Sequence, residues 1–260
     1  MNSNPILVVI PYLPGAGQGR ELEYAIAGWQ RHFKEDHTIV LVGDGVSALA
    51  RPDVVAIDSP RVEAREGQYR QHLDYVSCFR KVREAFPQSK GYIRVADDCY
   101  AVRDFDLQDV LTRKCIGTLG HNPMAIPGTW TGDLERTRQT LEADGFPTVN
   151  YTTHLPQWFE WEKIERLWRR YRMDETSYVD ENLYYNIYDA GRAAINVHTD
   201  EQPYKCGVYR PNPNVDYIEG CIGQRIWITN SPAGWVPQLD MMLAKYYFDE
   251  GDWVFTNRPD

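Results

Sequence analysis

The sequence lacks long apolar runs and has few cysteines. None of its 260 residues belongs to a stretch approaching the roughly 18 consecutive apolar residues of a membrane-spanning helix. The five cysteines include no Cys-x-x-Cys pair, which argues against a zinc site and against a disulfide framework. Because neither a basic segment nor an apolar leader precedes the first strand-like run, we expect a cytoplasmic protein.

Basic residues are also in the minority. Aspartate and glutamate total 37 against 28 lysines and arginines, so the formal net charge is -9 at pH 7. Such an acidic chain is a poor candidate for a general nucleic-acid or anionic-membrane binder. Residues 163–172 are locally basic, and we interpret them as a solvated helix face, which leaves DNA open as a partner without favouring it.

The first half of the chain, residues 1–125, alternates strand-like and helix-like segments. Residues 6–10 form a continuous apolar run that ends at Pro11, as expected of a strand buried on both faces. Residues 21–33 carry apolar side chains every three or four positions, which predicts a helix. Further strands are expected at residues 38–42, 54–57 and 92–96, and a further helix at residues 69–86. This alternation predicts the α/β class, with a doubly wound, mostly parallel sheet whose strand-end loops share one edge.

The second half, residues 126–260, is less regular and rich in aromatic residues. We expect it to pack on the first half as one globule. Residues 196–216 hold three prolines and little periodicity, which predicts a long ordered loop. Helices are expected at residues 134–143, 158–171, 180–188 and 239–248, and a strand at residues 224–229.

The most informative motif is the pair Asp97-Asp98 at the end of a strand-like run. Aspartate is depleted in strands, and two adjacent carboxylates repel each other, so the pair calls for an explanation. A divalent cation is one, because Mg²⁺ or Mn²⁺ takes hard oxygen ligands from one or two carboxylates and from a bound phosphate. An Asp-rich turn after an ordinary strand is the alternative.

Several short motifs, taken in order, resemble two families. The first apolar strand, the loop with Arg20, the strand ending at Asp44, the Arg-rich helix and Val95-Ala96-Asp97-Asp98 resemble nucleotide-sugar glycosyltransferases of the GT-A type, nearest to small phage- or bacterium-borne ones. Parts of the second half resemble the Stealth family of sugar-phosphate transferases. These parts are Thr153-His154-Leu155-Pro156, Asp180-Glu181-Asn182-Leu183-Tyr184-Tyr185 and the ending from Thr229-Asn230-Ser231 to Tyr247.

The GT-A resemblance implies a fold and an activity. It implies a GT-A-like sheet whose first half, residues 1–125, binds a nucleotide sugar and whose second half, residues 126–260, forms the acceptor side. The expected reaction is the metal-dependent transfer of a hexose from a UDP- or GDP-type donor to a glycan, a protein or hydroxymethylated DNA. The alternatives are a Stealth-like sugar-1-phosphate transferase and a non-catalytic carbohydrate-binding module.

Metal binding is expected at the acidic motif. The family pattern is Asp-x-Asp, and Ala96 occupies its first place here. Asp98 is therefore the expected ligand of Mn²⁺ or Mg²⁺, with Asp97 nearer the ribose or a metal-bound water. His198 and His154 are candidates to complete the metal site or to orient the sugar, because a neutral imidazole binds borderline metals.

Nucleotide binding is expected along the same edge. Arg20 ends a Gly-rich loop before a helix and is expected to reach the diphosphate, while Pro11 and Tyr12 flank the base. Asp44 is expected to accept from the ribose or from uracil. The segment that holds Arg65, Gln71 and Asp74 often meets the nucleotide in this family. A plain turn explains the Gly-rich loop and Asp44 as well, and a solvated face explains the helix residues.

The proton acceptor is expected at the start of a helix. Direct displacement at an anomeric carbon needs a base for the acceptor proton, and Asp180 and Glu181 are the candidates, with His154 as a third catalytic residue. Acidic residues in a first helical turn also need no catalytic explanation, because they interact favourably with the helix dipole and cap the helix.

Overall fold

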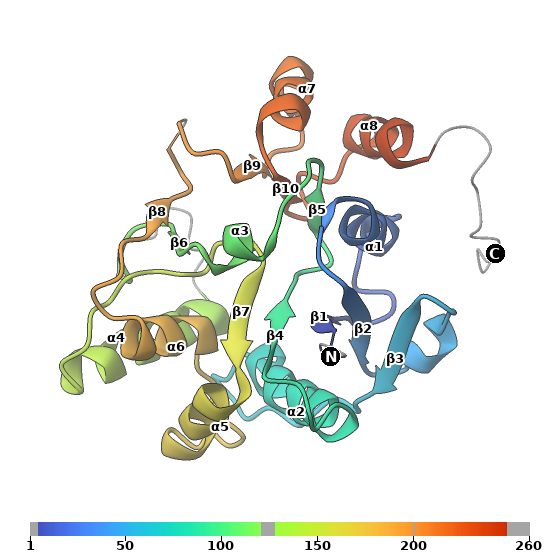
Figure 1. Cartoon of the computed structure of the whole chain (residues 1–260). Helices are drawn as coiled ribbons and strands as arrows, with labels where there is room; N and C mark the ends of the chain where they lie inside the picture. The colour runs from blue at the N-terminus through green and yellow to red at the C-terminus, as the bar shows by residue number, and fades with distance from the viewer. Residues whose placement is uncertain (1–4, 121–127, 200, 249–260) are drawn as a thin grey trace.

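The central sheet takes four strands from the first half of the chain and one from the second. The computed structural model describes residues 5–120, 128–199 and 201–248 (Figure 1). The strand order is β3-β2-β1-β4-β7, in which β1 to β4 run parallel and β7 runs antiparallel to β4. The strands are β1 (Ile6–Pro11), β2 (His37–Gly43), β3 (Val54–Asp58), β4 (Gly91–Arg94) and β7 (Gln157–Glu160). The predicted α/β class and mostly parallel sheet are confirmed.

Two short sheets and a set of helices surround the central sheet. Strand β10 (Trp227–Asn230) lies between β5 (Cys99–Ala101) and β9 (Lys205–Val208), and β6 (Lys114–Cys115) pairs with β8 (Ile195–Asn196). The helices are α1 (Glu21–His32), the 3₁₀-helix η1 (Val46–Leu49), α2 (Arg70–Ala85), α3 (Leu107–Leu111), α4 (Thr129–Ala143), α5 (Trp161–Arg170), α6 (Asp180–Tyr188), α7 (Val215–Gln224) and α8 (Pro237–Tyr247). None of the described helices is both long enough and apolar enough to cross a membrane.

Burial on both faces of the central sheet explains its continuous apolar strands. Leu7 and Val9 of β1 belong to a core that includes Phe79 of α2, whereas Val8 and Ile10 belong to a second core that includes residues of α1. Successive side chains of a strand point to opposite faces, so each face needs its own helical cover. The doubly wound arrangement is thereby confirmed (Figure 1).

The sequence-based expectations fail at several places in the second half, and two of them concern strands. Helix α7 was not expected either. The helix expected over residues 158–171 begins only at Trp161, because residues 157–160 form β7, where Phe159 pairs with Tyr92 of β4 and is fully buried. The loop expected over residues 196–216 contains β9, which pairs in parallel with β10. In both cases a partner strand distant in sequence overrides weak local signals.

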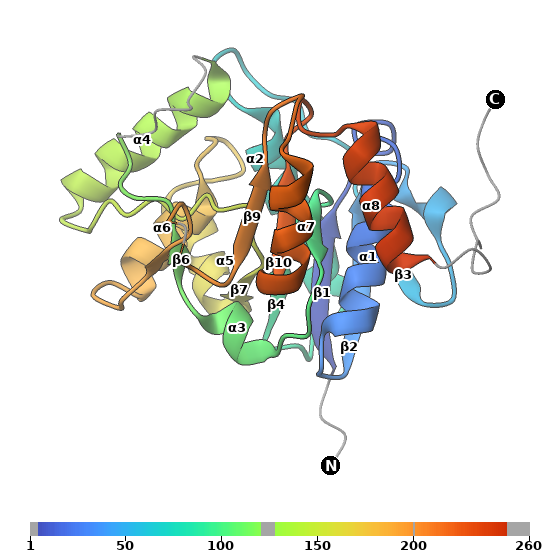
Figure 2. The same ribbon diagram turned by 90° about the horizontal axis from the view of Figure 1, so that it is seen from above.

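The second half also packs against the first helix. Helix α8 lies beside α1, and α7 lies beside α8, over the sheet formed by β5, β10 and β9 (Figure 2). Strand β5 begins directly after Asp98, so this small sheet borders the acidic motif. The predicted division of the chain at residue 125 stays a prediction.

Candidate functional site

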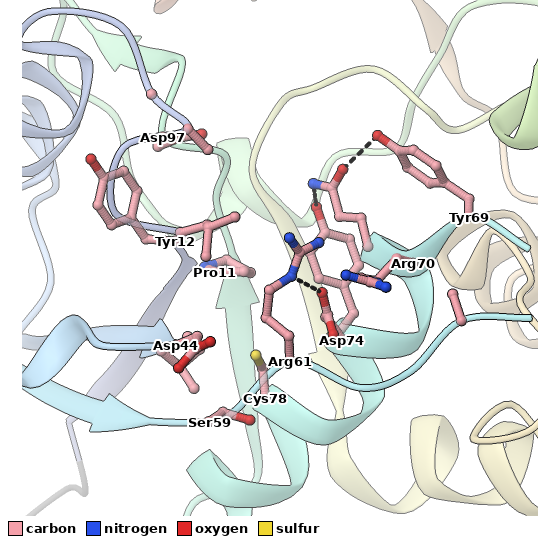
Figure 3. A pocket seen from close by; sticks show the side chains of 18 of the residues that line it. Pro11, Tyr12, Asp44, Ser59, Arg61, Tyr69, Arg70, Asp74, Cys78 and Asp97 are labelled. Atoms are coloured by element: carbon pink, nitrogen blue, oxygen red, sulfur yellow. Dashed lines mark hydrogen bonds and ion pairs between the residues drawn. The ribbon is translucent and has the colours of Figure 1, made fainter.

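A pocket of about 820 Å³ lies at the carboxyl ends of the parallel strands (Figure 3). Ligands bind at this edge in open α/β sheets, and the volume falls within the range of small-molecule sites. Most of the expected nucleotide and metal residues line it. They are Pro11, Tyr12, Asp44, Arg65, Gln71, Asp74, Asp97 and Asp98.

The ends of β1, β2 and β3 are held together by backbone contacts. The amide of Tyr12 donates to the carbonyl of Val42 at 2.9 Å, and the amide of Ser59 donates to the carbonyl of Gly43 at 2.8 Å. A Cβ atom on Gly43 would lie 1.8 Å from the carbonyl oxygen of Tyr12, so only glycine permits this crossing. The crossing places Tyr12, Asp44 and Ser59 on one wall of the pocket.

Three carboxylates, Glu21, Asp97 and Asp98, line the pocket together, and we call them the acidic corner. Burial, together with the charges of Asp98 and Glu21, raises the pKa of Asp97 to about 7. Burial also raises the pKa of Glu21. Burial, together with the neighbouring carboxylates, therefore disfavours the charged forms of Asp97 and Glu21.

The loop before α1 closes over this corner. The amide of Gln18 donates to Glu21 Oε2 at 2.6 Å, and Asn230 Nδ2 donates to Glu21 Oε1 at 2.7 Å. A Cβ atom on Gly17 would lie 3.3 Å from Asp97 Oδ2, so the loop backbone passes close to that carboxylate. The Gly-rich loop thus borders the site, and it contacts the acidic corner through its backbone.

The carboxylate of Asp98 has an oxygen atom without a hydrogen-bond partner among the described residues. This atom, Oδ1, is buried, and the Oδ2 atom lies 3.6 Å from His154 Nδ1. Within residues 5–120, 128–199 and 201–248, no three His, Cys, Asp or Glu side chains are arranged to hold a metal ion. Mg²⁺ and Mn²⁺ usually take only one or two carboxylates and complete their shell with phosphate and water. The acidic corner fits a cation of that kind.

His198 lies away from the pocket lining. Its backbone amide donates to Asn196 Oδ1 at 3.0 Å, and burial together with the charge of Lys205 lowers the pKa of its imidazole. Its expected part in the metal site stays a prediction.

The opposite wall of the pocket carries arginines (Figure 3). Arg61 Nε lies 3.1 Å from Asp74 Oδ2, and the Val62 amide donates to Asp74 Oδ1 at 2.8 Å, so Asp74 fixes the loop before α2. Arg65 and Arg70 also line the pocket, and neither side chain forms an ion pair with another described residue. Two guanidinium groups are therefore available to an anion.

A chain of hydrogen bonds forms the adjoining wall. Tyr69 OH donates to Gln71 Oε1 at 2.8 Å, and Gln71 Nε2 donates to Tyr75 OH at 2.6 Å (Figure 3). The guanidinium carbon of Arg94 lies 5.2 Å from the centre of the Tyr75 ring. Gln71 therefore belongs to a hydrogen-bonded wall of the pocket that is already formed without a ligand.

Arg20 does not line the pocket. Its Nε and Nη2 atoms donate to Asp240 Oδ1 of α8 at 3.2 and 3.1 Å, and its guanidinium lies 5.0 Å over the ring of Tyr24. The preceding residue, Gly19, has a φ of +52°, and a Cβ atom there would lie 2.8 Å from the ring of Trp235, so the loop passes close to the segment before α8. Arg20 is thus paired with Asp240 in this structure. Its expected contact with the diphosphate stays a prediction.

Asp180 and Glu181 lie behind the pocket, in a buried ion-pair cluster. Arg94 Nη1 donates to Asp180 Oδ1 at 2.6 Å, and Arg94 Nη2 donates to Glu181 Oε2 at 2.7 Å. A buried arginine requires such partners, which explains both carboxylates without proton transfer. Their role as a base stays a prediction that this geometry does not favour.

The sequence reasoning missed several lining residues, above all Glu21, Ser59, Tyr69 and Tyr75. Glu21 follows the Gly-rich loop, but an acidic residue in a first helical turn is common. Only its contact with Asn230, from the far end of the chain, distinguishes it.

The chain is structurally similar to glycosyltransferases. A glycosyltransferase involved in the glycosylation of the major capsid of PBCV-1 shares 9% identity and a TM-score of 0.41, over 87% of this chain and 93% of that one. The apo-form glycosyltransferase GlyE of Streptococcus pneumoniae TIGR4 shares 12% identity and a TM-score of 0.38, over 95% of this chain and 61% of that one. This chain thus spans less than two thirds of GlyE. No family model and no curated protein sequence matches. At these identities and TM-scores, neither similarity establishes the activity of this chain. The residues of its own pocket are therefore the basis for a functional proposal.

Proposed function

We propose that this protein is a glycosyltransferase that binds a nucleoside-diphosphate sugar in the pocket and transfers a hexose to a hydroxyl acceptor. The observation that carries the proposal is the charge distribution of the pocket: the acidic corner lies on one side and the arginine wall on the other. A diphosphate with a bound divalent cation matches both sides, because its oxygens suit the guanidinium groups and its cation suits the carboxylates.

The nucleoside would occupy the end of the pocket formed by β1, β2 and β3. Pro11 and Tyr12 offer an apolar surface for the base, and Asp44 offers an acceptor for ribose hydroxyls. Asp97, next to the cation ligand, would contact the ribose or a metal-bound water. Gln71 and Asp74 would act by fixing the wall on which the donor lies.

The diphosphate would lie between Asp98 and the arginines. Asp98 would hold Mn²⁺ or Mg²⁺, and this cation would neutralise charge on the leaving group. Arg65 and Arg70 would donate hydrogen bonds to the same oxygens and stabilise the charge as it develops. We assign these two residues the part that the sequence suggested for Arg20.

Transfer forms a bond between the acceptor oxygen and the anomeric carbon, and it breaks the bond from that carbon to the terminal phosphate oxygen. The nucleoside diphosphate leaves with the electron pair, and the acceptor proton must go to a base. His154 adjoins Asp98, and 54% of its side-chain surface is exposed. We propose His154 as this base, since an imidazole can take a proton near neutral pH, with Asp180 and Glu181 as the alternatives.

The test is a donor screen by mass spectrometry. The protein is incubated with UDP- and GDP-sugars, with MnCl₂ or with EDTA, and slow hydrolysis to water reports turnover without a known acceptor. Release of free nucleoside diphosphate that EDTA abolishes is the expected result. Release of nucleoside monophosphate would instead identify a sugar-phosphate transferase, and carbohydrate binding without any turnover would identify a binding module. Either of these outcomes overturns the proposal.

A further inference from the structure

Lys205, the first residue of β9, is a buried cation outside the proposed mechanism. It is only 5% exposed, and its Nζ atom donates to the carbonyl of Thr153 at 2.5 Å. The ring of Tyr209 lies 5.4 Å from the same atom. Removing an ammonium group from water is costly unless partners compensate, so its position calls for a reason.

The carbonyl that Lys205 binds belongs to Thr153, and the next residue, His154, has an unusual backbone conformation. His154 has a φ of 59°, in the left-handed region that a non-glycine residue adopts only at an energetic cost. The turn is fixed on both sides: the Thr153 amide donates to Tyr151 O at 2.7 Å, and the Leu155 amide donates to Thr153 Oγ1 at 3.3 Å. Leu155 is buried. The Lys205 contact adds a third fixed point, the carbonyl of Thr153.

The head group of Lys205 also lies in the electrostatic field of the acidic corner. Burial lowers its pKa to about 8, while the charges of Cys99 and Asp98 oppose that shift. Asp98 is tied to the same small sheet, since the Asn230 amide of β10 donates to Asp98 O at 3.4 Å. Lys205 thus connects β9, the turn at residues 153–154 and the segment that carries Asp98.

We infer that Lys205 is a positioning residue: its ammonium group holds the carbonyl of Thr153 and thereby keeps His154 in place beside Asp98. The consequence for transfer rests on the proposed function, but the effect on the turn does not. Without Lys205, the strained turn would relax, and the imidazole would leave its place 3.6 Å from Asp98.

Lys114 offers a matched control. It is 4% exposed, and its Nζ atom donates to the carbonyls of Asp109 and Thr112. It also lies over Trp227, the residue of β10 that pairs with Lys205. It does not line the pocket. Replacing Lys114 therefore removes an equally buried ammonium group near the same sheet while leaving the turn at residues 153–154 untouched.

The experiment compares Lys205→Met with Lys114→Met by hydrogen exchange and mass spectrometry. In Lys205→Met, the amides of residues 153–155 should exchange at least roughly tenfold faster than in the wild type, whereas in Lys114→Met they should not. Equal exchange in the two variants, or no change in Lys205→Met, overturns the inference. If Lys205→Met does not fold, the same comparison uses Lys205→Gln, which keeps a shorter donor, against Lys114→Gln.

Turnover separates this inference from the proposed function. With a donor that the wild type uses, Lys205→Met should lower kcat and leave the donor KM within about twofold, because the turn lies outside the nucleotide end of the pocket. A rise in KM with kcat unchanged would contradict the positioning role. If the wild type turns over no donor, the proposed function fails, and the exchange result still decides the role of Lys205.

Discussion

Arg94 Nη1 donates to Asp180 Oδ1 at 2.6 Å, and this contact ties the strand before the acidic motif to the start of α6. The Asp180 side chain is 3% exposed and that of Arg94 is 9% exposed, so the pair is desolvated. The guanidinium also lies over the rings of Tyr75 and Phe159, the first of which lines the pocket. The cluster therefore supports the pocket wall from behind.

Replacing Asp180 by Asn should mainly affect stability. Removing one member of a buried ion pair costs about 3–5 kcal/mol, so thermal unfolding should occur well below the wild-type temperature. Asp174→Asn is the control, because that residue contacts Arg80 on the exposed surface and its loss should leave the melting temperature nearly unchanged. An Asp180→Asn variant with wild-type stability and transfer slowed by about 10²–10⁴ would instead identify Asp180 as the base.

Arg70→Ala should weaken a nucleoside diphosphate far more than the nucleoside. The loss of a hydrogen bond to a charged group costs about 1.5–3 kcal/mol, which corresponds to roughly 10- to 150-fold in Kd. Isothermal titration calorimetry with UDP and uridine, or with GDP and guanosine, measures the difference.

Arg20→Ala is the matched comparison for that experiment. Its ion pair with Asp240 is partly exposed, so its removal should cost only about 0.2–1 kcal/mol of stability. Diphosphate affinity should stay close to that of the wild type. A selective loss of diphosphate binding in Arg20→Ala, with none in Arg70→Ala, would restore the role expected from the sequence.

Asp98→Asn should retain the fold and lose cation-dependent donor binding. The amide keeps the shape of the side chain but removes the charge that would hold a divalent cation. In the wild type, MnCl₂ should tighten diphosphate binding, and EDTA should reverse the effect. In Asp98→Asn the two conditions should give the same Kd. A variant that still responds to Mn²⁺ as the wild type does would place the cation elsewhere.

Stability should fall with rising pH because of Asp97. Its pKa is about 7 in the folded protein, against an ordinary value of 3.8, so the folded state binds more protons than the unfolded state between these values. The free energy of unfolding therefore decreases from about pH 4 to pH 7 and levels off above. Relative to the wild type, Asp97→Asn should gain stability over this window in urea unfolding.

Asp53→Asn provides the contrasting case. Hydrogen bonds from Arg51 and Gln30 lower the pKa of Asp53 to about 2, so its contribution to stability is present above the ordinary value of 3.8 and is lost only at lower pH. Because these partners are a guanidinium and an amide, the difference of this variant from the wild type should stay constant between pH 4.5 and 8. If Asp97→Asn also shows a constant difference, Asp97 titrates as an ordinary carboxyl group.

The parts of the fold that the sequence predicted are those with local causes. The buried strands β1 and β2 are continuous apolar runs, and α1 and α2 repeat apolar side chains at helical spacing. Strands β7 and β9 are short, and their apolar content is ordinary. They become strands because β4 and β10 pair with them, which no local pattern records.

The same distinction applies to the site. The position of Tyr12, Asp44 and Asp97 in the pocket lining was predictable, because each follows a parallel strand and such strand ends share one edge. The ion pairs of Arg20 and Asp180 were not predictable, because their partners, Asp240 and Arg94, lie far away in sequence. A charged side chain beside a loop or at a helix start looks the same whether it meets a ligand or another part of the chain.

The small sheet of β5, β10 and β9 has a consequence for the order of folding. Glu21 of the acidic corner accepts a hydrogen bond from the side chain of Asn230, the last residue of β10, and the Asn230 amide donates to the carbonyl of Asp98. Such contacts close very long loops, and loops of this kind form late because of their entropy cost. During synthesis, the acidic corner therefore cannot be fully assembled until the C-terminal part of the chain has been made. A fragment that ends before β9 would contain all five strands of the central sheet and still lack an assembled site.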